Sequence, residues 1–375
     1  AGYLLKKKFQ LPLQIQIHTD FLSPYFRKES FKNKIRVLLA KWLLPKADKI
    51  RVVSQRIKNS LASKIKCPTS DVAILPIFVD AEKIKSAPIK TDLHQKYSNH
   101  DFIILMASRL TKEKNIVLAL EAFAGVKCQM SDVKCLLLIV GDGPALQKLK
   151  VKCHKLNVAT NVSFEPWTDD LASYYKTADL FLLTSNYEGY GRTVVEAAAG
   201  GLPTIMTDVG LAGDFLKNDF NGLVVPVNDK NALINAINGM IKNREKLKQF
   251  SQNNEKEVNL LITKEEYLKK YADTAERLSK PLFIFSCGDF TDSLRFDSRI
   301  WVFRQSLYKS SMESRDICIP TTTEDPPKEL LFIRNKNKKP IVAFCGMGGF
   351  SSVRSWIKYH AENLFYECVA LLKPE

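Results

Sequence analysis

The sequence predicts an α/β protein built of two doubly wound domains, of which the first is incomplete. Strand-like and helical segments alternate along most of the chain, and this alternation is typical of parallel sheets with crossover helices. In the second domain the strand-like segments are near-continuous apolar runs, as expected when helices cover both faces of a sheet. These runs are Phe102–Ala107, Cys135–Val140, Val162–Phe164, Leu180–Thr184, Pro203–Thr207 and Leu223–Pro226.

The first domain, predicted over residues 1–80, is a partial one. Its strand-like segments are Gln14–His18, Lys49–Val53 and Val72–Leu75. Between them, Phe31–Leu44 has helical spacing and stops at Pro45, and Ser54 is placed to cap a helix that runs to about Lys64. Three strands are few for a doubly wound sheet. The chain starts at Ala1 without a charged-then-apolar leader, so we expect the beginning of this domain to be missing.

The rest of the chain divides into three predicted parts. Residues 81–100 are expected to be a linker, because Pro76–Tyr97 is irregular. Residues 101–280 form the second domain, which ends with an amphipathic helix at Glu265–Leu278. Residues 281–375 change in character: Phe283–Cys287 and Ile341–Cys345 look like strands, but the stretch between them is polar. We therefore expect an appended region of uncertain fold.

Charge is concentrated at the start of the chain. Residues 1–66 hold 16 Lys and Arg against Asp20, Glu29 and Asp48, a balance of +13 out of +16 for the whole chain. Such a segment suits an anionic membrane surface, although a merely solvated basic face is the plain alternative. No nucleic-acid-binding motif accompanies these cations, so nucleic acid is not an expected partner.

The cysteines and the hydropathy pattern bear on the cellular location. None of the eight cysteines forms a Cys-x-x-Cys pair, which favours buried or incidental thiols in a reducing compartment over a metal or redox site. No apolar run approaches the roughly 18 residues that a membrane-spanning helix needs. We expect a cytoplasmic protein, either free or peripheral at the inner face of the membrane, and no metal site.

The sharpest motif is Asn186–Ala197, which follows a buried strand and opens a helix. Gly189 and Gly191 let the backbone approach a ligand closely, and a helix that begins at Arg192 and Thr193 presents unpaired N–H groups to an anion. A diphosphate suits this arrangement. The plain alternative is a capped helix after a tight turn.

Two carboxylates belong to the same motif. Glu196 lies on the first turns of the helix, where it can accept hydrogen bonds from ribose hydroxyls, and Glu188 lies in the preceding loop, where it can face a sugar. The plain alternative is that Glu188 and Glu196 are two surface glutamates without a ligand.

Two cations follow the first strand of the same domain. Arg109 and Lys114 belong to a strand-to-helix loop, and such loops gather at the carboxyl edge of a parallel sheet, where ligands bind. Arginine supplies a planar fork and lysine a point charge, a suitable pair for two phosphates whose charge grows as a bond to them breaks. The plain alternative is that Arg109 and Lys114 are two solvated basic residues without a ligand.

Two weaker signals lie at neighbouring strand ends. Gly141-Asp142-Gly143 lacks the third glycine of a dinucleotide fingerprint and favours a plain tight turn. Phe164–Thr168, which contains Trp167, either lines a nucleobase pocket through backbone contacts or packs as ordinary structure.

At these residues the chain resembles family 4 of the retaining GT-B glycosyltransferases, the glycosyl transferases group 1. The resemblance covers residues 11–279 and is strongest over 102–226. Besides Arg109 and Lys114 it rests on the Glu188-to-Glu196 spacing and on the segments Gly141–Gly143, Gly200–Pro203 and Asn221–Pro226. It implies a GT-B fold with two Rossmann-like doubly wound domains, the first incomplete.

The resemblance also implies roles for single residues. Arg109 and Lys114 would hold the diphosphate of a nucleotide-sugar donor, such as a UDP- or GDP-sugar, Glu188 would contact the donor sugar, and Glu196 the ribose. His18, at a strand end of the first domain, looks like the family's active-site histidine, with a structural histidine as the alternative. The reaction would retain anomeric configuration, with a glycan or lipid-linked acceptor in polysaccharide or glycolipid synthesis and no cofactor beyond the donor substrate.

The sequence departs from the family in two places. The family's opening strands and its glycine-rich loop are absent from the first domain, and residues 281–375 resemble exostosin-like polysaccharide-synthesis proteins only faintly. An inactive or vestigial nucleotide-sugar-binding protein therefore stays an alternative. A nucleotide-sugar 2-epimerase, which shares the GT-B architecture, is a further one.

Overall fold

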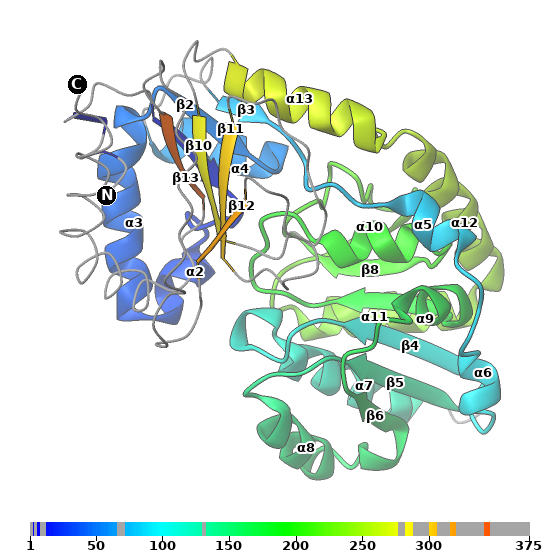
Figure 1. Ribbon diagram of the computed structural model, residues 1–375. Helices are drawn as coiled ribbons and strands as arrows, with labels where there is room; N and C mark the ends of the chain where they lie inside the picture. The colour runs from blue at the N-terminus through cyan, green and yellow to red at the C-terminus, as the bar shows by residue number, and fades with distance from the viewer. Residues whose placement is uncertain are drawn as a thin grey trace.

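The computed structural model has two lobes, each built around a parallel sheet (Figure 1). It describes residues 3, 6, 7, 13–65, 72–129 and 133–276, together with four strands at 282–287, 300–305, 316–319 and 341–345.

The second lobe contains a sheet in the order β6-β5-β4-β7-β8-β9, in which every pair is parallel. All six predicted strands are present, as β4 (Phe102–Ala107), β5 (Cys135–Val140), β6 (Val162–Glu165), β7 (Leu180–Leu183), β8 (Thr204–Thr207) and β9 (Gly222–Val225). The connecting helices are η3 (Lys112–Lys114), α7 (Ile116–Gln129), α8 (Leu146–Lys155), η4 (Ala159–Asn161), α9 (Leu171–Thr177), α10 (Arg192–Ala199) and α11 (Lys230–Lys242). The sheet is doubly wound, as the apolar runs predict.

The order of this sheet reverses at one place. From β4 the chain proceeds outward through β5 and β6, and it then returns to β7, which pairs with the other side of β4 and leads outward to β8 and β9. The connections that leave the carboxyl ends of β4 and β7 therefore run to opposite faces of the sheet, and a crevice opens between them. In open α/β sheets this switch point is where ligands bind.

The first lobe contains a sheet in the order β12-β11-β10-β13-β1-β2-β3. The predicted strands β1 (Gln14–Ile17), β2 (Lys49–Val52) and β3 (Val72–Ile74) form one side of it. The other side consists of β10 (Leu282–Cys287), β11 (Ile300–Gln305), β12 (Asp316–Ile319) and β13 (Ile341–Cys345). Here the structure differs from the expectation of an incomplete first domain followed by a separate appended region, because these four strands extend the first sheet.

The pairing of β13 with β1 gives a physical reason for this difference. In parallel register, Ile15 lies beside Phe344 and Gln16 beside Cys345. Without that partner, β1 would be an edge strand with a row of unpaired backbone groups. Local sequence patterns identify a strand, but they do not show which distant strand lies beside it.

Three helices of the first lobe begin at serine caps, as the residue types suggest. They are α2 (Pro24–Glu29), α3 (Phe31–Leu43) and α4 (Gln55–Lys64), and a 3-10 turn, η1 (Leu44–Lys46), follows α3. The Ser30 side chain accepts a hydrogen bond from the Asn33 N–H at the start of α3, and Ser54 accepts one from the Ile57 N–H at the start of α4. The capping predicted for Ser54 is confirmed.

The segment expected to be an irregular linker contains two short helices. They are α5 (Ala81–Ser86) and α6 (Leu93–Lys96). Asp80 caps α5 through the Lys83 N–H, and Asp92 caps α6 through the His94 N–H. Aspartate side chains are good acceptors for the unpaired N–H groups of a first helical turn, and they favour helices even this short.

The chain returns to the first lobe after the second sheet. α12 (Arg244–Asn259) is followed by α13 (Lys264–Glu276), which lies over the strands of the first lobe (Figure 1). From α13, the Tyr271 hydroxyl accepts a hydrogen bond from Gln16 Nε2 at 3.0 Å, and the Thr274 carbonyl accepts one from Gln14 Nε2 at 3.1 Å. The helix that we placed at the end of the second domain thus packs against the first sheet.

The two faces of the second sheet contribute to different cores. Along β4, Ile103 and Leu105 face a cluster that continues into the first lobe through residues such as Val52. Ile104 and Met106 face the opposite way, into a cluster within the second lobe. This alternation follows from the two-residue period of a strand. The lobes are therefore joined by a shared apolar core on one face.

Candidate functional site

Two predicted site residues meet at the switch point of the second sheet. Lys114 lies in the loop after β4 and Glu188 in the loop after β7, and Lys114 Nζ lies 2.5 Å from Glu188 Oε1. The Ser185 hydroxyl donates to the same oxygen at 2.7 Å. Both charged side chains are partly buried. Because both contacts reach Oε1, Oε2 accepts no hydrogen bond from the described residues, and this oxygen is available to a ligand hydroxyl.

Polar contacts hold the two loops together. The Thr184 hydroxyl donates to the carbonyls of Lys114 and Asn115, at 3.0 and 3.1 Å. Asn115 has a φ of 46°, in the left-handed region that asparagine tolerates better than most residues. The Asn186 N–H donates to the Glu113 carbonyl at 2.8 Å. The lysine and the glutamate are thus placed by backbone geometry.

The motif's second glutamate lies on α10. Glu196 accepts a hydrogen bond from Arg192 Nε at 2.6 Å, one helical turn earlier, and another from the Tyr175 hydroxyl at 3.1 Å. Gly191 precedes the helix with a φ of 97°, a left-handed conformation that costs glycine little. This turn points the first N–H groups of α10, those of Arg192 and Thr193, out of the helix without intrahelical partners.

Arg109 lies apart from this group. Its Nη2 pairs with Glu113 Oε1 at 3.3 Å, and its side chain is 77% exposed. The loop that carries it is held by the glycine turn after β5: a Cβ on Gly141 would lie 2.1 Å from the Ser108 carbonyl oxygen. The Leu110 N–H also donates to the Asp142 carbonyl at 2.8 Å. The tight turn predicted at Gly141–Gly143 therefore has a packing function.

The first lobe contacts the site at Gly189. A Cβ built on this glycine would lie 1.8 Å from the His18 carbonyl oxygen, so only glycine fits here. The Ser54 hydroxyl donates to the Gly189 carbonyl at 2.9 Å. His18 follows β1 and Ser54 follows β2, and hence the carboxyl edge of the first sheet meets the loop that carries Glu188.

His18 is held in its neutral form. Burial lowers its pKa from 6.5 to about 3, and the nearby Arg51 guanidinium adds to the effect. Arg51 is itself fully buried in β2, where its guanidinium donates to Gln16 Oε1 at 2.8 Å and to the Tyr267 hydroxyl at 3.0 Å and lies 4.6 Å from the Tyr271 ring centroid. At neutral pH the His18 imidazole carries no charge.

Sequence reasoning missed several residues that support the site. Ser185, Tyr175 and Ser54 contact the motif directly, and the charge of Arg51 helps to lower the pKa of His18. A hydroxyl two positions beyond a buried strand, as at Ser185, is a signal that the sequence offers. The others come from distant segments and leave no local pattern.

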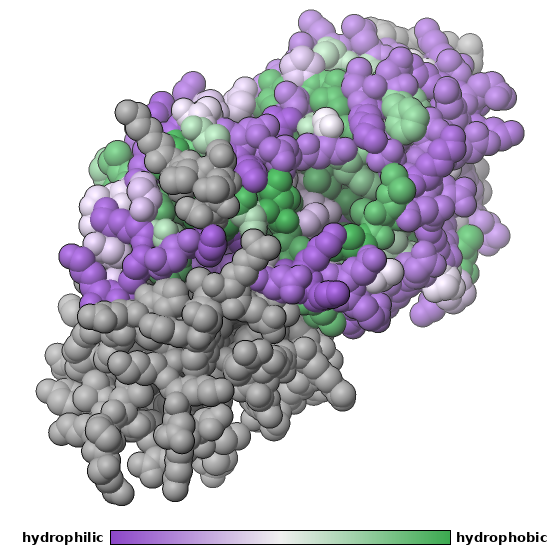
Figure 2. Space-filling view, turned by 90° about the horizontal axis from the view of Figure 1, so that it is seen from above, coloured by the Kyte–Doolittle hydropathy of each residue, from purple (hydrophilic) through white to green (hydrophobic). Residues whose placement is uncertain are grey.

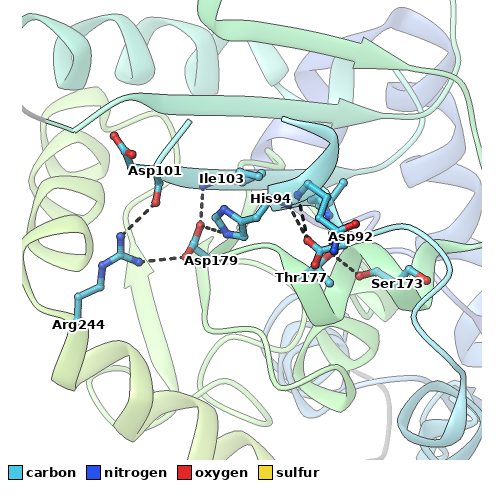
Figure 3. A network of polar contacts seen from close by, with 10 residues as sticks. Asp92, His94, Asp101, Ile103, Ser173, Thr177, Asp179 and Arg244 are labelled. Atoms are coloured by element: carbon cyan, nitrogen blue, oxygen red, sulfur yellow. Dashed lines mark hydrogen bonds and ion pairs between the residues drawn. The ribbon is translucent and has the colours of Figure 1, made fainter. Parts of the chain in front are cut away.

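The opposite edge of the second sheet carries a separate network. Asp179, which precedes β7, accepts from Arg244 Nη1 at 3.0 Å, pairs with His94 Nε2 at 3.1 Å, and accepts from the Ile103 N–H at 2.7 Å (Figure 3). These groups come from α12, α6 and β4. They lie at the amino ends of the strands and do not contribute to the candidate site.

Two features are absent from the described part of the chain: a membrane-spanning helix and a cluster of metal ligands. Its helices include none that is both long enough and apolar enough to cross a membrane. Across the same residues, no three His, Cys, Asp or Glu side chains gather as a metal ion would require.

Comparison with solved structures defines the fold class. The structure of Anabaena Alr3699/HepE in complex with UDP matches 74% of this chain and 75% of its own, with a TM-score of 0.63 and 21% sequence identity. The same protein has also been solved with UDP-glucose. The fold is GT-B, with a Rossmann-like sheet in each lobe.

Comparison with family models and curated proteins points to a family within the GT-B fold. Residues 90–257 match the family model for Glycosyl transferases group 1. The UDP-Gal:alpha-D-GlcNAc-diphosphoundecaprenol alpha-1,3-galactosyltransferase of Escherichia coli is 28% identical over 220 residues, which are 56% of this chain and 57% of that protein. The alpha-monoglucosyldiacylglycerol synthase of Streptococcus pneumoniae is 29% identical over 54% of this chain and 48% of its own length. These matches support the Glycosyl transferases group 1 family. The chain spans about half the length of these relatives.

Proposed function

We propose that this chain is a retaining glycosyltransferase that moves a sugar from a nucleotide-diphosphate donor to a glycan or lipid-linked acceptor. The observation that carries the proposal is the meeting of Lys114 and Glu188 at the switch point of the second sheet, beside the start of α10 and against the His18 backbone. A cation, a carboxylate and free helix N–H groups are the chemistry that a sugar diphosphate requires.

The diphosphate would bind between the loop after β4 and the start of α10. Lys114 would exchange part of its pairing with Glu188 for a phosphate oxygen, and the N–H groups of Arg192 and Thr193 would donate to the same anion. Arg109 is exposed and paired with Glu113 only at 3.3 Å, so a rotation of its side chain would bring a second cation to the diphosphate.

The two glutamates would orient the rest of the donor. Glu188 Oε2 is available to hydroxyls of the donor sugar, because the Lys114 and Ser185 contacts both use Oε1. Glu196 uses both oxygens, with Arg192 and Tyr175, but each carboxylate oxygen has two acceptor positions. The ribose hydroxyls would donate to those that remain.

In the transfer step, the bond between the anomeric carbon and the diphosphate oxygen breaks, and a bond to the acceptor hydroxyl oxygen forms on the same face. The hydroxyl proton passes to the leaving phosphate. Lys114 would stabilise the charge that develops on that phosphate. His18, which is neutral, would offer a hydrogen bond to the sugar from the first lobe without placing a second cation there.

The names of the relatives suggest the acceptor class. The names of the two curated relatives contain diphosphoundecaprenol and diacylglycerol, both lipids. For this chain we propose a glycan or lipid-linked acceptor, a cytoplasmic location at the inner face of the membrane, and an anionic membrane partner for the basic segment 1–66. The donor is a substrate, and the proposal includes no further cofactor.

Calorimetric titration with UDP- and GDP-sugars tests the donor site. Arg109→Ala or Lys114→Ala should weaken binding of the nucleotide diphosphate by about 1–3 kcal/mol, the size of a charge-assisted hydrogen bond. Lys112→Ala, in the same turn and exposed, is the matched control and should bind normally. If all three variants bind the nucleotide diphosphate as tightly as the unmodified chain, Arg109 and Lys114 do not hold the diphosphate.

Product analysis separates the alternatives. Transfer to an acceptor with retained anomeric configuration supports the proposal. Donor binding without turnover would identify a vestigial binding protein, and inversion at C2 of the donor sugar would identify an epimerase.

A further inference from the structure

Arg51 is a buried cation whose partners are uncharged groups. Its side chain is 1% exposed. Its guanidinium donates to Gln16 Oε1 at 2.8 Å, to the Tyr267 hydroxyl at 3.0 Å and to the Leu75 carbonyl at 3.4 Å, and the Tyr271 ring centroid lies 4.6 Å away. None of these partners is a carboxylate, and the buried Nε has no hydrogen-bond partner among the described residues. The charge of this arginine is thus solvated by neutral groups and is not cancelled by a counter-charge.

An arginine held in this way does not serve stability best. A buried charge raises the free energy of the folded chain unless a counter-ion or a full set of hydrogen bonds compensates for it. An apolar side chain of similar length at the same strand position would fill the space without that penalty. The retention of a cation at this position therefore indicates a role for its charge.

The pairing of strands places Arg51 next to the residues that lead to His18. Gln16 of β1 lies opposite Arg51 of β2 in parallel register, and His18 follows Gln16 by two positions. Because side chains alternate between the two faces of a strand, His18 continues the face on which Gln16 contacts Arg51. Part of the His18 surface is exposed, whereas Arg51 is fully buried. A ligand can therefore touch the imidazole but not the guanidinium.

α13 covers this polar cluster. The helix lies over the strands of the first lobe and buries Tyr267 and Tyr271, which give Arg51 a hydroxyl and a ring face instead of a carboxylate. Seen from the side on which α13 lies, hydrophilic residues cover much of the coloured surface (Figure 2). The exposed charged residues of the helix are Lys264, Glu265, Glu266, Lys269, Lys270 and Asp273. The helix thus keeps its charges in water and excludes water from Arg51, which strengthens the field of the guanidinium.

The field of Arg51 reaches the imidazole of His18. Burial is the larger cause that lowers the pKa of His18 to about 3, and the charge of Arg51 is the second. A carboxylate beside Arg51 would cancel most of this second effect. The other titratable residues on the elements that pack here are Asp20 after β1, Tyr267 and Tyr271 on α13, and Glu188 and Tyr190 in the loop after β7.

We propose that Arg51 is a positioning residue for His18: the buried cation, left without a counter-charge, keeps a second positive charge off the imidazole, so that His18 meets the donor sugar as a neutral hydrogen-bonding group. An imidazolium would lie near an anomeric carbon that gains positive charge as its bond to the diphosphate breaks, and it would oppose the transfer. The part of this inference that concerns the sugar rests on the proposed function. The effect of Arg51 on His18 does not.

Nuclear magnetic resonance of the imidazole nitrogens tests the inference in the full chain without any donor. The chain is labelled with isotope-enriched histidine, and His18→Gln identifies the His18 signals. In the unmodified chain these signals should remain those of a neutral ring down to the lowest pH at which circular dichroism shows folded protein. In Arg51→Gln they should move toward imidazolium values, with protonation about 1 pH unit higher than in the unmodified chain.

Further variants separate the charge of Arg51 from its packing. Arg51→Met, an apolar chain of similar length, should behave like Arg51→Gln, whereas Arg51→Lys keeps the cation and should restore the neutral ring. Tyr267→Phe removes a hydrogen-bond partner but no charge and should leave the His18 signals unchanged. The matched control is Arg56→Gln, which removes an arginine of α4 that pairs with Asp208, and it should not move the His18 signals.

The inference is overturned if His18 stays neutral in Arg51→Gln and Arg51→Met to the same pH as in the unmodified chain, because burial is then sufficient by itself. It is also overturned if both neutral variants fail to fold, since Arg51 would then serve the structure. Calorimetry with UDP and GDP keeps the proposed function apart. Nucleotide binding should be the same in all Arg51 variants, and its absence from the unmodified chain would refute the donor site but not the effect of Arg51 on His18.

Discussion

Among the described residues, Asp179 at the amino-terminal edge of the second sheet has three partners, from α12, α6 and β4, whereas Glu188 at the carboxyl edge has two, both on one oxygen. The first arrangement joins separate elements, so its removal should cost stability. The second pairs Lys114 with one oxygen of Glu188 and leaves the other oxygen to a ligand, and its removal should cost function. Polar groups at the two ends of the same strands thus serve different purposes.

The largest effect should follow from Lys114→Ala at the carboxyl edge. Loss of the cation that stabilises a leaving diphosphate should lower kcat/KM for sugar transfer by about 10²–10³, the usual effect of removing one group that stabilises transition-state charge. Steady-state kinetics measure it, and Lys112→Ala should retain normal rates. A Lys114→Ala variant with full activity would contradict the functional role that we assign to the carboxyl edge of the sheet.

The next effect should follow from Asp179→Ala at the amino-terminal edge. It leaves the Ile103 N–H and Arg244 without their carboxylate, and we expect a loss of about 2–3 kcal/mol in the free energy of unfolding, measured in urea. Asp208→Ala, which breaks a more exposed pair with Arg56, should cost about 1 kcal/mol or less. Donor affinity should not change in Asp179→Ala. A changed affinity would show that the Asp179 network also affects the donor site at the carboxyl edge.

Two glycines give a smaller and opposite pair of effects. Gly189→Ala places a Cβ against the His18 carbonyl and should destabilise the chain by about 1–3 kcal/mol, as overpacking does. Gly239 lies in α11 with open space where its Cβ would be, so Gly239→Ala should stabilise by about 0.5–1 kcal/mol. Thermal unfolding of both variants compares them, and equal stabilities would refute the close approach of the lobes at Gly189.

The last effect concerns pH. His18 has a folded-state pKa of about 3, below its usual 6.5, so the unfolded chain binds this proton first as pH falls. Its contribution to stability is complete above pH 6.5 and declines on acidification by about 1 kcal/mol per pH unit. Urea titrations between pH 7 and 5 should show a shallower decline in His18→Gln. Parallel pH dependences would mean that the pKa of His18 is the same in the folded and the unfolded chain.

Much of the site is visible in the sequence because its parts are local. Glu188, Gly191 and Glu196 lie within one strand-loop-helix unit, and Lys114 follows a neighbouring strand. Once the chain is recognised as parallel α/β, the carboxyl ends of such strands must share an edge. That reasoning does not predict the Arg109–Glu113 pairing, because long exposed side chains choose among partners that only coordinates reveal.

The alternation of apolar runs with helical stretches determined the doubly wound second sheet, and the loop residues determined which edge would carry charge. Only the tertiary structure decided that β10 to β13 extend the first sheet, that α13 packs over it, and that Gly189 contacts His18. Secondary structure follows from periodicities within a dozen residues. Strand neighbours and contacts between lobes depend on surfaces that form only after distant segments have folded.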